Sequence, residues 1–221
     1  MVATTRSEEN YLKAIYHLSQ PNNKVVSTNA IAEKIESKAS SVTDMLKKLA
    51  DKHLLTHIKY KGVTLTEKGR AQALNIIRKH RLWEFFLVEK LNFSWDEVHE
   101  VAEQLEHIKS PKLIKELDAY LNHPTHDPHG DPIPDETGMF QTSSKIKLAQ
   151  AEINSTCICV GVKDSSTKFL KYLDKLNIAL GTQLKVLEKE TFDESMLVLV
   201  RNKEIHISKI VSQNLYVKIK L

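Results

Sequence analysis

The chain has 221 residues, and its content of 41% hydrophobic and 27% charged residues excludes a disordered or fibrous protein. No stretch approaches the ~18 consecutive apolar residues of a membrane span, and the opening MVATTRSEEN holds no apolar signal core, so we expect a cytoplasmic protein without membrane contact. The net charge of +4 at pH 7 hides a strong regional asymmetry.

The first third of the chain is predicted to form three short helices and a hairpin. Ser7 is the expected N-cap of the first helix, and Ser27 or Thr28 that of the second. A Lys61-Gly62 pair separates two apolar stretches, as in a β-hairpin with a basic tip. We predict helices over residues 7–19, 29–35 and 41–53, and strands over 54–60 and 63–66. This order of elements is typical of a winged helix-turn-helix.

Helical patterns fill the middle of the chain, over residues 67–91, 95–107 and 111–121. Residues 123–139 contain four prolines, two glycines and three histidines, which predicts a loop with fixed corners and a candidate functional segment. Short alternating stretches then predict strands over 156–162, 183–187, 196–200, 204–208 and 216–219, with one helix over 166–173. Such closely spaced short strands indicate a small β-barrel.

The predicted fold class is therefore mainly α with a small β component. We expect a winged helix-turn-helix domain over residues 1–73, a helical domain over 74–140, a linker over 141–150 and a small β-barrel over 151–221. The two cysteines, Cys157 and Cys159, are too close in sequence for an ordinary disulfide and point to the same face of a strand. We interpret them as small buried hydrophobic residues, with a thiolate metal or redox pair as the alternative.

Charge follows the same division. Residues 1–73 carry 12 basic and 7 acidic side chains, residues 74–140 carry 7 and 13, and residues 141–221 carry 13 and 8. Six of the ten histidines also lie in the acidic middle segment. Basic segments favour polyanions, and carboxylates clustered with imidazoles favour cations, so the pattern suggests two different ligands on one chain.

The second helix of a helix-turn-helix enters the major groove, where its first residues reach base edges and flanking cations hold phosphates. Serine, threonine and aspartate can exchange hydrogen bonds with bases, and Asp44 suits a cytosine amino group. The alternative is a helical hairpin with a solvated basic face. The candidate DNA-binding residues are Lys38, Ser40, Thr43, Asp44 and Lys47 on the helix, and Lys59 and Lys61 on the wing.

The helix predicted over 95–107 carries candidate metal ligands. At ~100° per residue, His99, Glu103, Glu106 and His107 fall within about a third of the circumference, opposite an apolar face. Glu103, Glu106 and His107 could therefore converge on one ion. His80 and Glu84 form a second pair of the same donor types, so one or two sites between helices are possible. A solvated acidic face is the alternative. The opposite, apolar face consists of Val98, Val101, Leu105 and Ile108.

Four stretches of this sequence, SEENYLKAIYHL, SSVTDMLKKLADKHLLTHIKYKGVTLTEKG, RKHRLWEFF and EVHEVAEQLEH, resemble the iron- and manganese-dependent repressors typified by the diphtheria toxin repressor and the manganese transport regulator. The resemblance covers nearly the whole chain, and the last third is similar to the small barrel of longer members. It implies a homodimer, paired through the helices beyond Gly69, that binds double-stranded operator DNA when a divalent metal is bound.

The resemblance also implies a primary metal site, formed by Asn10, Glu103, Glu106 and His107. Glutamate at position 103 is typical of the manganese-responsive relatives, whereas the iron-responsive branch has cysteine. Asn10 stands where one branch of the family has methionine and the other has aspartate. The Asn10 amide oxygen can bind a metal but brings no charge. A second acidic residue that completes a binuclear site in manganese regulators is replaced here by Lys13, which argues against that arrangement.

A second site is implied by the same resemblance. Streptococcal-type manganese relatives use a Cys-Pro-His-Gly loop there, and this chain has Asp-Pro-His-Gly over residues 127–130. Aspartate makes the donor set harder than cysteine, which favours manganese, iron or magnesium over copper or zinc. The residues implied are His80, Glu84, His99, Asp127, His129 and, from the barrel, Asp164.

The expected function is that of a metal-dependent transcriptional repressor of metal homeostasis, with Mn(II) first and Fe(II) next as co-repressor. A winged-helix regulator of an organic ligand or redox signal is the first alternative. A carboxylate-rich metalloenzyme is the second, but the sequence has no phosphate-binding glycine loop, no HExxH motif and no obvious nucleophile beside a base, so we expect no enzyme.

Overall fold

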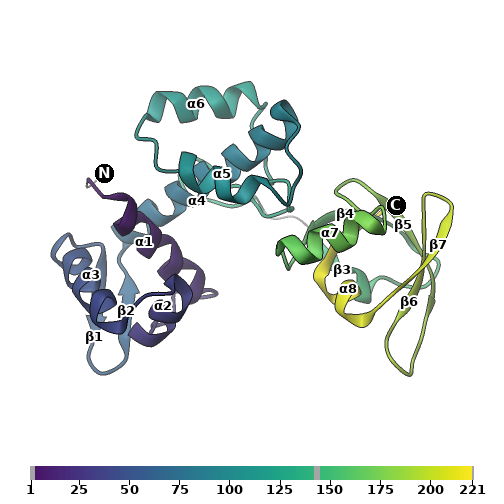
Figure 1. The fold of residues 1–221 in the computed structure, drawn as a ribbon, viewed down its shortest axis with the longest axis horizontal. Helices are drawn as coiled ribbons and strands as arrows, with labels where there is room; N and C mark the ends of the chain where they lie inside the picture. The colour runs from purple at the N-terminus through teal and green to yellow at the C-terminus, as the bar shows by residue number, and fades with distance from the viewer. Residues whose placement is uncertain (1–2, 142–144, 221) are drawn as a thin grey trace. The chain divides into compact units, whose positions relative to one another are not determined.

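The computed structural model of the chain describes residues 3–141 and 145–220 (Figure 1). It divides into two compact units, the first holding the residues up to 80 with 104–111 and 134–139, and the second holding 81–103, 112–133 and the residues from 140. The domain boundaries predicted from the sequence stay predictions, and residues 142–144 of the predicted linker lie outside the described residues.

Helix α1 (Arg6–Ser19) begins with a capping box that the sequence analysis missed. Ser7 is not its N-cap, because Thr5 takes that position: the Thr5 hydroxyl accepts a hydrogen bond from Glu8 N at 3.3 Å, and the Glu8 carboxylate accepts one from Thr5 N at 2.8 Å. This reciprocal pair satisfies two backbone donors at once, which a single Ser7 cap would not do. Leu12 and Ile15, on the inner face of α1, are fully buried.

The helix-turn-helix follows as predicted, with small differences at the ends. Ser27 caps α2 (Thr28–Ile35), and Glu36 in the left-handed conformation ends it. Helix α3 (Ala39–Asp51) starts two residues earlier than predicted, since no side chain caps it and nothing in the sequence marks its first residue. Strands β1 (Leu55–Ile58) and β2 (Gly62–Leu65) pair antiparallel as the wing. The predicted winged helix-turn-helix is confirmed.

Gly62 closes the wing in a backbone conformation that favours glycine, with φ of +133°. A Cβ atom at this position would lie 2.0 Å from Val26 O. The close approach is needed because Val26 and Val63 exchange two backbone hydrogen bonds of 2.9 Å, which attach the wing to the segment before α2.

The middle of the chain is helical, as expected. Helix α4 (Glu67–Leu91) has its predicted ends, and α6 (Pro111–Tyr120) ends one residue early. Helix α5 (Val98–Leu105) is shorter than the predicted 95–107, because the Ser94 carbonyl and the Glu97 side chain close a turn before it. None of the described helices is both long enough and apolar enough to cross a membrane.

The shortened α5 changes the expected faces. Val98, Ala102 and Glu106, spaced by four residues, are the fully buried positions of this segment. Val101, Leu105 and Ile108, predicted to line the buried face, are only half-buried. Glu106 therefore continues the buried stripe instead of opposing it, and it lies with His107 in the turn after the helix.

The last third forms a six-stranded antiparallel sheet in the order β3-β8-β4-β5-β6-β7. The predicted strands and helix all occur, within a few residues of their expected ends: β4 (Thr156–Val162), α7 (Thr167–Lys175), β5 (Gln183–Lys189), β6 (Met196–Val200), β7 (Lys203–Ile207) and β8 (Leu215–Ile219). Three further elements were not predicted: β3 (Ile146–Lys147), the 3-10 turn η1 (Leu148–Gln150) and α8 (Lys209–Asn214). Cys157 and Cys159 are free and buried in the core of this sheet, as predicted.

The predicted loop over 123–139 is confirmed as irregular and is fixed by its own side chains and by β4. The Asp127 carboxylate accepts hydrogen bonds from His129 N at 2.8 Å and Asp131 N at 2.9 Å. His129 O accepts one from Val162 N at 2.8 Å. Gly130 lies so close to β4 that a Cβ would be 2.0 Å from Val160 O. The loop therefore holds Asp127 and His129 in fixed positions within the second unit.

Candidate metal centres and DNA-binding surface

The predicted DNA-reading residues all lie on exposed positions of the first unit. Thr43 donates its hydroxyl hydrogen to Ala39 O at 2.9 Å, so its oxygen can still accept a hydrogen bond but its hydrogen is committed. Asp44 and Lys47 approach to 3.7 Å, and both are more than half exposed, so this pair contributes little to stability. The predicted residues on and beside α3, all exposed, are Lys38, Ser40, Thr43, Asp44 and Lys47.

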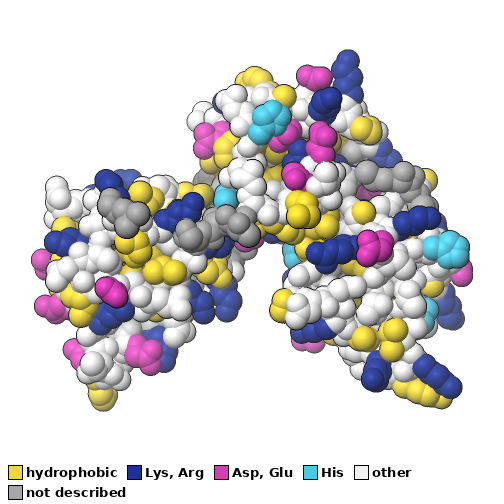
Figure 2. Space-filling view, turned by 180° about the vertical axis from the view of Figure 1, so that it is seen from behind, with side chains coloured by type: hydrophobic (Ala, Val, Ile, Leu, Met, Phe, Trp, Pro, Cys, Tyr) yellow, Lys and Arg dark blue, Asp and Glu magenta, His cyan; other side chains and the backbone are white. Residues whose placement is uncertain are grey.

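The wing presents a compact basic tip. Lys59 and Lys61 are exposed on either side of Tyr60, which is 95% exposed, and the Lys59 ammonium lies 5.0 Å from the Tyr60 ring centroid. Figure 2 shows Lys and Arg side chains interspersed with acidic ones over the face it draws, so no single continuous basic patch marks that face.

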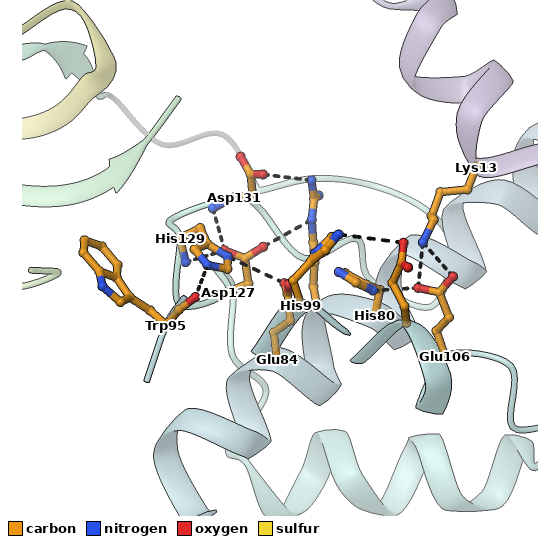
Figure 3. Close-up of polar contacts among 11 residues, drawn as sticks. Lys13, His80, Glu84, Trp95, His99, Glu106, Asp127, His129 and Asp131 are labelled. Atoms are coloured by element: carbon orange, nitrogen blue, oxygen red, sulfur yellow. Dashed lines mark hydrogen bonds and ion pairs between the residues drawn. The ribbon is translucent and has the colours of Figure 1, made fainter. Parts of the chain in front are cut away.

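Glu106 is the centre of a buried charge cluster in the first unit. Its side chain is fully buried, and Lys13 Nζ donates to both of its oxygens, at 2.7 and 2.9 Å. His80 Nδ1 lies 2.6 Å from the Glu106 Oε2 atom (Figure 3). Burial pushes the pKa of the Glu106 carboxyl upward, but His80 and Lys13 outweigh burial and hold that pKa below its ordinary value. Glu106 is therefore an anion with two positive or proton-donating partners.

His107 and Asn10 present unused acceptors in the same unit. His107 Nδ1 lies 2.6 Å from Glu9 Oε2; since a carboxylate only accepts, this contact places a hydrogen on Nδ1 and leaves Nε2 as the ring nitrogen that could bind a metal. That Nε2 atom is buried, makes no hydrogen bond and lies 3.5 Å from Glu106 Oε1. The Asn10 Oδ1 atom is also buried without a hydrogen-bond partner. A carboxylate that orients a histidine in this way is common at metal sites.

Glu103, the fourth residue implied for the primary site, lies on α5 one turn before Glu106. Its side chain is 46% exposed, and one of its oxygens is 3.7 Å from His99 Nε2. The sequence-derived idea that Glu103, Glu106 and His107 converge on one ion stays a prediction.

A second cluster joins α4 to the loop within the second unit. Glu84, Asp127 and His129 are all buried, and each offers a ligand atom within 4.8 Å of the others. Figure 3 shows Asp127 and His129 on the loop directed toward Glu84. His129 Nε2 donates to Trp95 O at 2.7 Å, so the Nδ1 atom, 3.8 Å from Glu84 Oε2, is the one available to a metal.

The two loop residues of this cluster have shifted pKa values. Burial and the negative charges of Glu84 and Asp131 raise the pKa of Asp127 to about 7, although Arg81 opposes the shift. Burial alone would lower the pKa of His129, but Glu84 and Asp127 raise it to about 9. Buried carboxylates that repel one another and retain protons are typical of a site that a cation would stabilise.

The remaining predicted ligands have partners of their own. His99 Nδ1 lies 3.3 Å from Glu84 Oε1, which adds an imidazole to the second cluster. His80 lies one helical turn before Glu84 on α4 and contacts Glu106. Asp164 is exposed, and its carboxylate accepts a hydrogen bond from Ser166 N at the start of α7. Whether Asp164 closes the second site stays a prediction.

Both clusters fit a divalent cation by the chemistry of their donors. The first offers the Glu106 carboxylate and two buried acceptors that lack hydrogen bonds, and the second offers two buried carboxylates and an oriented imidazole. Oxygen and imidazole donors of this kind suit Mn(II) or Fe(II). In the first cluster, the Glu106 carboxylate already has a cationic partner in Lys13.

Four contributing residues escaped the sequence analysis as partners of the clusters: Glu9, Lys13, Arg81 and Trp95. Glu9 could have been suspected, since an acidic residue beside a ligand often orients a histidine. Lys13 was considered only as the loss of an acidic ligand, not as a cation that contacts Glu106. The contacts of Arg81 with Asp127 and of the Trp95 carbonyl with His129 carry no sequence pattern.

The fold and its buried sites define a winged-helix DNA-binding regulator with a carboxylate- and histidine-lined helical segment and a C-terminal sheet domain. Residues 3–63 match the N-terminal DNA binding domain of iron dependent repressors, residues 66–135 match their metal binding and dimerisation domain, and residues 146–219 match the FeoA domain. The chain belongs to the iron-dependent repressor family, a family of DNA-binding repressors and not of enzymes.

Individual relatives agree with this assignment. The iron-dependent repressor IdeR of Mycobacterium tuberculosis is 38% identical over 127 residues, which cover 57% of this chain and 54% of IdeR, so the chain spans about half the length of this relative. An uncharacterised HTH-type transcriptional regulator of Methanocaldococcus jannaschii is 37% identical over 53% of this chain and 94% of its own length. A solved manganese-dependent transcriptional repressor in complex with manganese is 34% identical, with a TM-score of 0.79 over 96% of this chain and all of that one.

Proposed function

We propose that the chain is a metal-dependent, DNA-binding transcriptional repressor that acts as a homodimer on double-stranded operator DNA. The observation that carries this proposal is the pair of buried acceptors without hydrogen bonds, Asn10 Oδ1 and His107 Nε2, in the same compact unit as the winged helix-turn-helix. Asn10 lies on α1, which packs against α2 and the wing strand β2. A cation bound by Asn10 could therefore influence the DNA-binding elements through α1.

Manganese is the metal we favour, with ferrous iron next. The donors are carboxylates, an amide oxygen and imidazoles, with no thiolate among them, and this set suits hard to intermediate dications. The chain is similar to one relative named for iron and to a solved structure named for manganese, so similarity alone does not decide between the two metals.

The coupling between metal and DNA follows from the position of α1. A metal held by Asn10, Glu103, Glu106 and His107 would fix α1 against the turn after α5, and α1 would in turn hold the α2–α3 pair. In a homodimer this would bias the spacing of two recognition helices toward successive major grooves. Linkage requires DNA to tighten metal binding by the same factor, with a coupling of ~1 to 3 kcal/mol per site.

A second metal site is proposed at Glu84, Asp127 and His129, with His80, His99 and Asp164 as further ligands. It lies where the loop meets β4, so its metal would tie the helical segment of the second unit to the sheet domain. We propose that metal binding at this second site tunes the DNA-binding response to metal, and that the sheet domain docks at this site.

The test of the proposed function is DNA binding with and without metal. DNA selected from a random pool by the manganese-loaded chain should bind tightly with Mn(II) or anaerobic Fe(II) and weakly after chelation. Fluorescence anisotropy gives both affinities, and size-exclusion chromatography with light scattering gives the oligomeric state. Equal affinity with metal and with chelator would contradict the proposal.

The wing and the recognition helix should differ in what they contribute to DNA binding. Lys59→Ala and Lys61→Ala are expected to weaken binding to selected and scrambled DNA about equally. Each should also reduce the slope of log K against log salt by roughly 0.9 for every phosphate contact that is lost. Substitutions at Ser40, Thr43 or Asp44 should instead change sequence preference, by ~1 to 3 kcal/mol for each base contact. Binding curves at several salt concentrations separate the two effects.

Lys168, exposed on α7 in the sheet domain, provides the control, since Lys168→Ala removes the same charge far along the chain from the wing. The salt slope of that variant should match the wild-type slope. A loss of binding confined to the selected DNA in the wing variants would refute the phosphate assignment.

A further inference from the structure

The Lys13–Glu106 pair places a protein cation on a proposed metal ligand. The two residues are 93 positions apart in the chain, yet Lys13 Nζ lies 2.7 and 2.9 Å from the two Glu106 oxygens. Glu106 is fully buried, while the Lys13 side chain is 15% exposed. Lys13 follows Asn10 by three residues on α1, so the two side chains share one face of that helix.

Both oxygens of Glu106 are occupied in this arrangement. One contacts Lys13 and faces the acceptor His107 Nε2 at 3.5 Å, and the other contacts Lys13 and His80. A dication that binds the carboxylate beside His107 takes over the role of the ammonium, and the two like charges would repel each other at this range. Lysine can withdraw, because its flexible four-carbon stem lets a strongly hydrated ammonium return to water.

Other charges near the cluster support a competition between cations. Lys79 on α4 is buried and interacts electrostatically with both Glu9 and Glu106. Two lysines therefore already act on the carboxylates of Glu9 and Glu106 before any metal binds.

We propose that Lys13 is a tethered competitor of the metal and sets the metal concentration at which the primary site fills. Lys13 holds Glu106 in place in the metal-free chain, and metal binding exchanges this ion pair for a metal–carboxylate bond. This inference rests on the proposed function, since it assumes that the site at Glu106 and His107 binds the co-repressor.

A second lysine–glutamate pair, between Glu8 on α1 and Lys52 at the end of α3, gives a matched control. Lys52 Nζ lies 2.7 Å from Glu8 Oε1, with the lysine side chain 33% exposed and the glutamate 6% exposed. The partners of the Glu8 carboxylate are Lys52 and the Thr5 backbone, and the contact with Thr5 is part of the capping box of α1. The two pairs thus have similar geometry, but only the Lys13 pair lies at a proposed metal ligand.

The test compares Lys13→Met with Lys52→Met in the full chain, using calorimetric titration with Mn(II) and thermal unfolding with and without metal. Lys13→Met should lower the metal-free Tm, because the buried Glu106 carboxylate loses the ammonium that contacts both of its oxygens. It should also tighten Mn(II) binding by roughly 5- to 150-fold, the usual range of coupling between two ligands. Lys52→Met should lower the metal-free Tm and leave Mn(II) affinity unchanged.

Unchanged or weaker Mn(II) binding by Lys13→Met would overturn the inference. If Lys13→Met does not fold, Lys13→Arg is the variant to test. A guanidinium holds a carboxylate through two parallel hydrogen bonds, so Lys13→Arg should weaken Mn(II) binding. Mn(II) affinity of Lys13→Arg equal to or tighter than that of the wild type would refute the inference. Two results together would overturn this inference and leave the proposed function intact. The wild-type chain would bind DNA in response to Mn(II), and Lys13→Met would need the same Mn(II) concentration as the wild type. Wild-type chain that binds no Mn(II) overturns the proposed function as well.

Discussion

Replacing His107 by alanine is expected to raise the Mn(II) concentration needed for tight DNA binding by at least about 100-fold. His107 Nε2 is buried without a hydrogen bond, and the Nδ1 atom contacts Glu9, so the ring is held with Nε2 as the nitrogen that could bind a cation. Loss of a residue that merely orients such a ligand already costs about 10- to 100-fold in metal affinity. Anisotropy titrations with Mn(II) at fixed DNA measure the shift.

Neighbouring glutamates on α1 allow a finer test of the same site. Glu9→Gln should weaken Mn(II) binding by about 10- to 100-fold, because the amide orients His107 less strongly than a carboxylate does. Glu8 is equally buried but contacts Lys52 instead, so Glu8→Gln should leave Mn(II) affinity unchanged. Thermal unfolding in chelator shows whether each variant is folded. Equal loss of metal affinity in both variants would mean that α1 responds to substitution as a whole and that Glu9 has no specific role.

Helix ends, helix caps and strands could be predicted where a single local sequence pattern determines them. The ends of α4, the Ser27 cap of α2 and the alternation of β4 and β6 are of this kind. The start of α1 was misplaced because two caps, Thr5 and Ser7, compete within three residues, and reciprocity with Glu8 decides between them.

The metal sites could be predicted less fully from the sequence, because they depend on contacts between residues far apart in the chain. Periodicity alone placed Glu106 on a polar face, whereas its pairing with Lys13 and His80 lets it be buried. Nor does a sequence show which ring nitrogen of a histidine is available: that is set by Glu9 for His107 and by the Trp95 carbonyl for His129. The donor types could be read from the sequence, but the direction in which each points could not.

Metal binding at Glu84, Asp127 and His129 is expected to release protons and to tighten steeply with pH. The pKa of His129 is raised to about 9 and that of Asp127 to about 7, so the metal-free site holds a proton on His129 at neutral pH and gains another on Asp127 below about pH 7. A metal needs the lone pair of His129 Nδ1 and the Asp127 carboxylate, so it must displace these protons. Affinity should therefore rise about tenfold per pH unit between pH 7 and 9, and about a hundredfold per unit below pH 7.

The measurement is anaerobic calorimetric titration with Mn(II) from pH 6.0 to 8.5 in the His107→Ala background, in which the first site is weakened and the second site binds first. Repeating each titration in two buffers of different ionisation enthalpy counts the protons, and about one proton per metal should be released near pH 8. His129→Ala should reduce this release, because the proton that the metal displaces near pH 8 belongs to its imidazole. Asp127→Asn removes the carboxyl proton instead, so the slope below pH 7 should fall to that seen above it. An affinity for Mn(II) that does not change with pH in the His107→Ala background would mean that the metal does not bind His129 and Asp127. That result would refute the proposed second site.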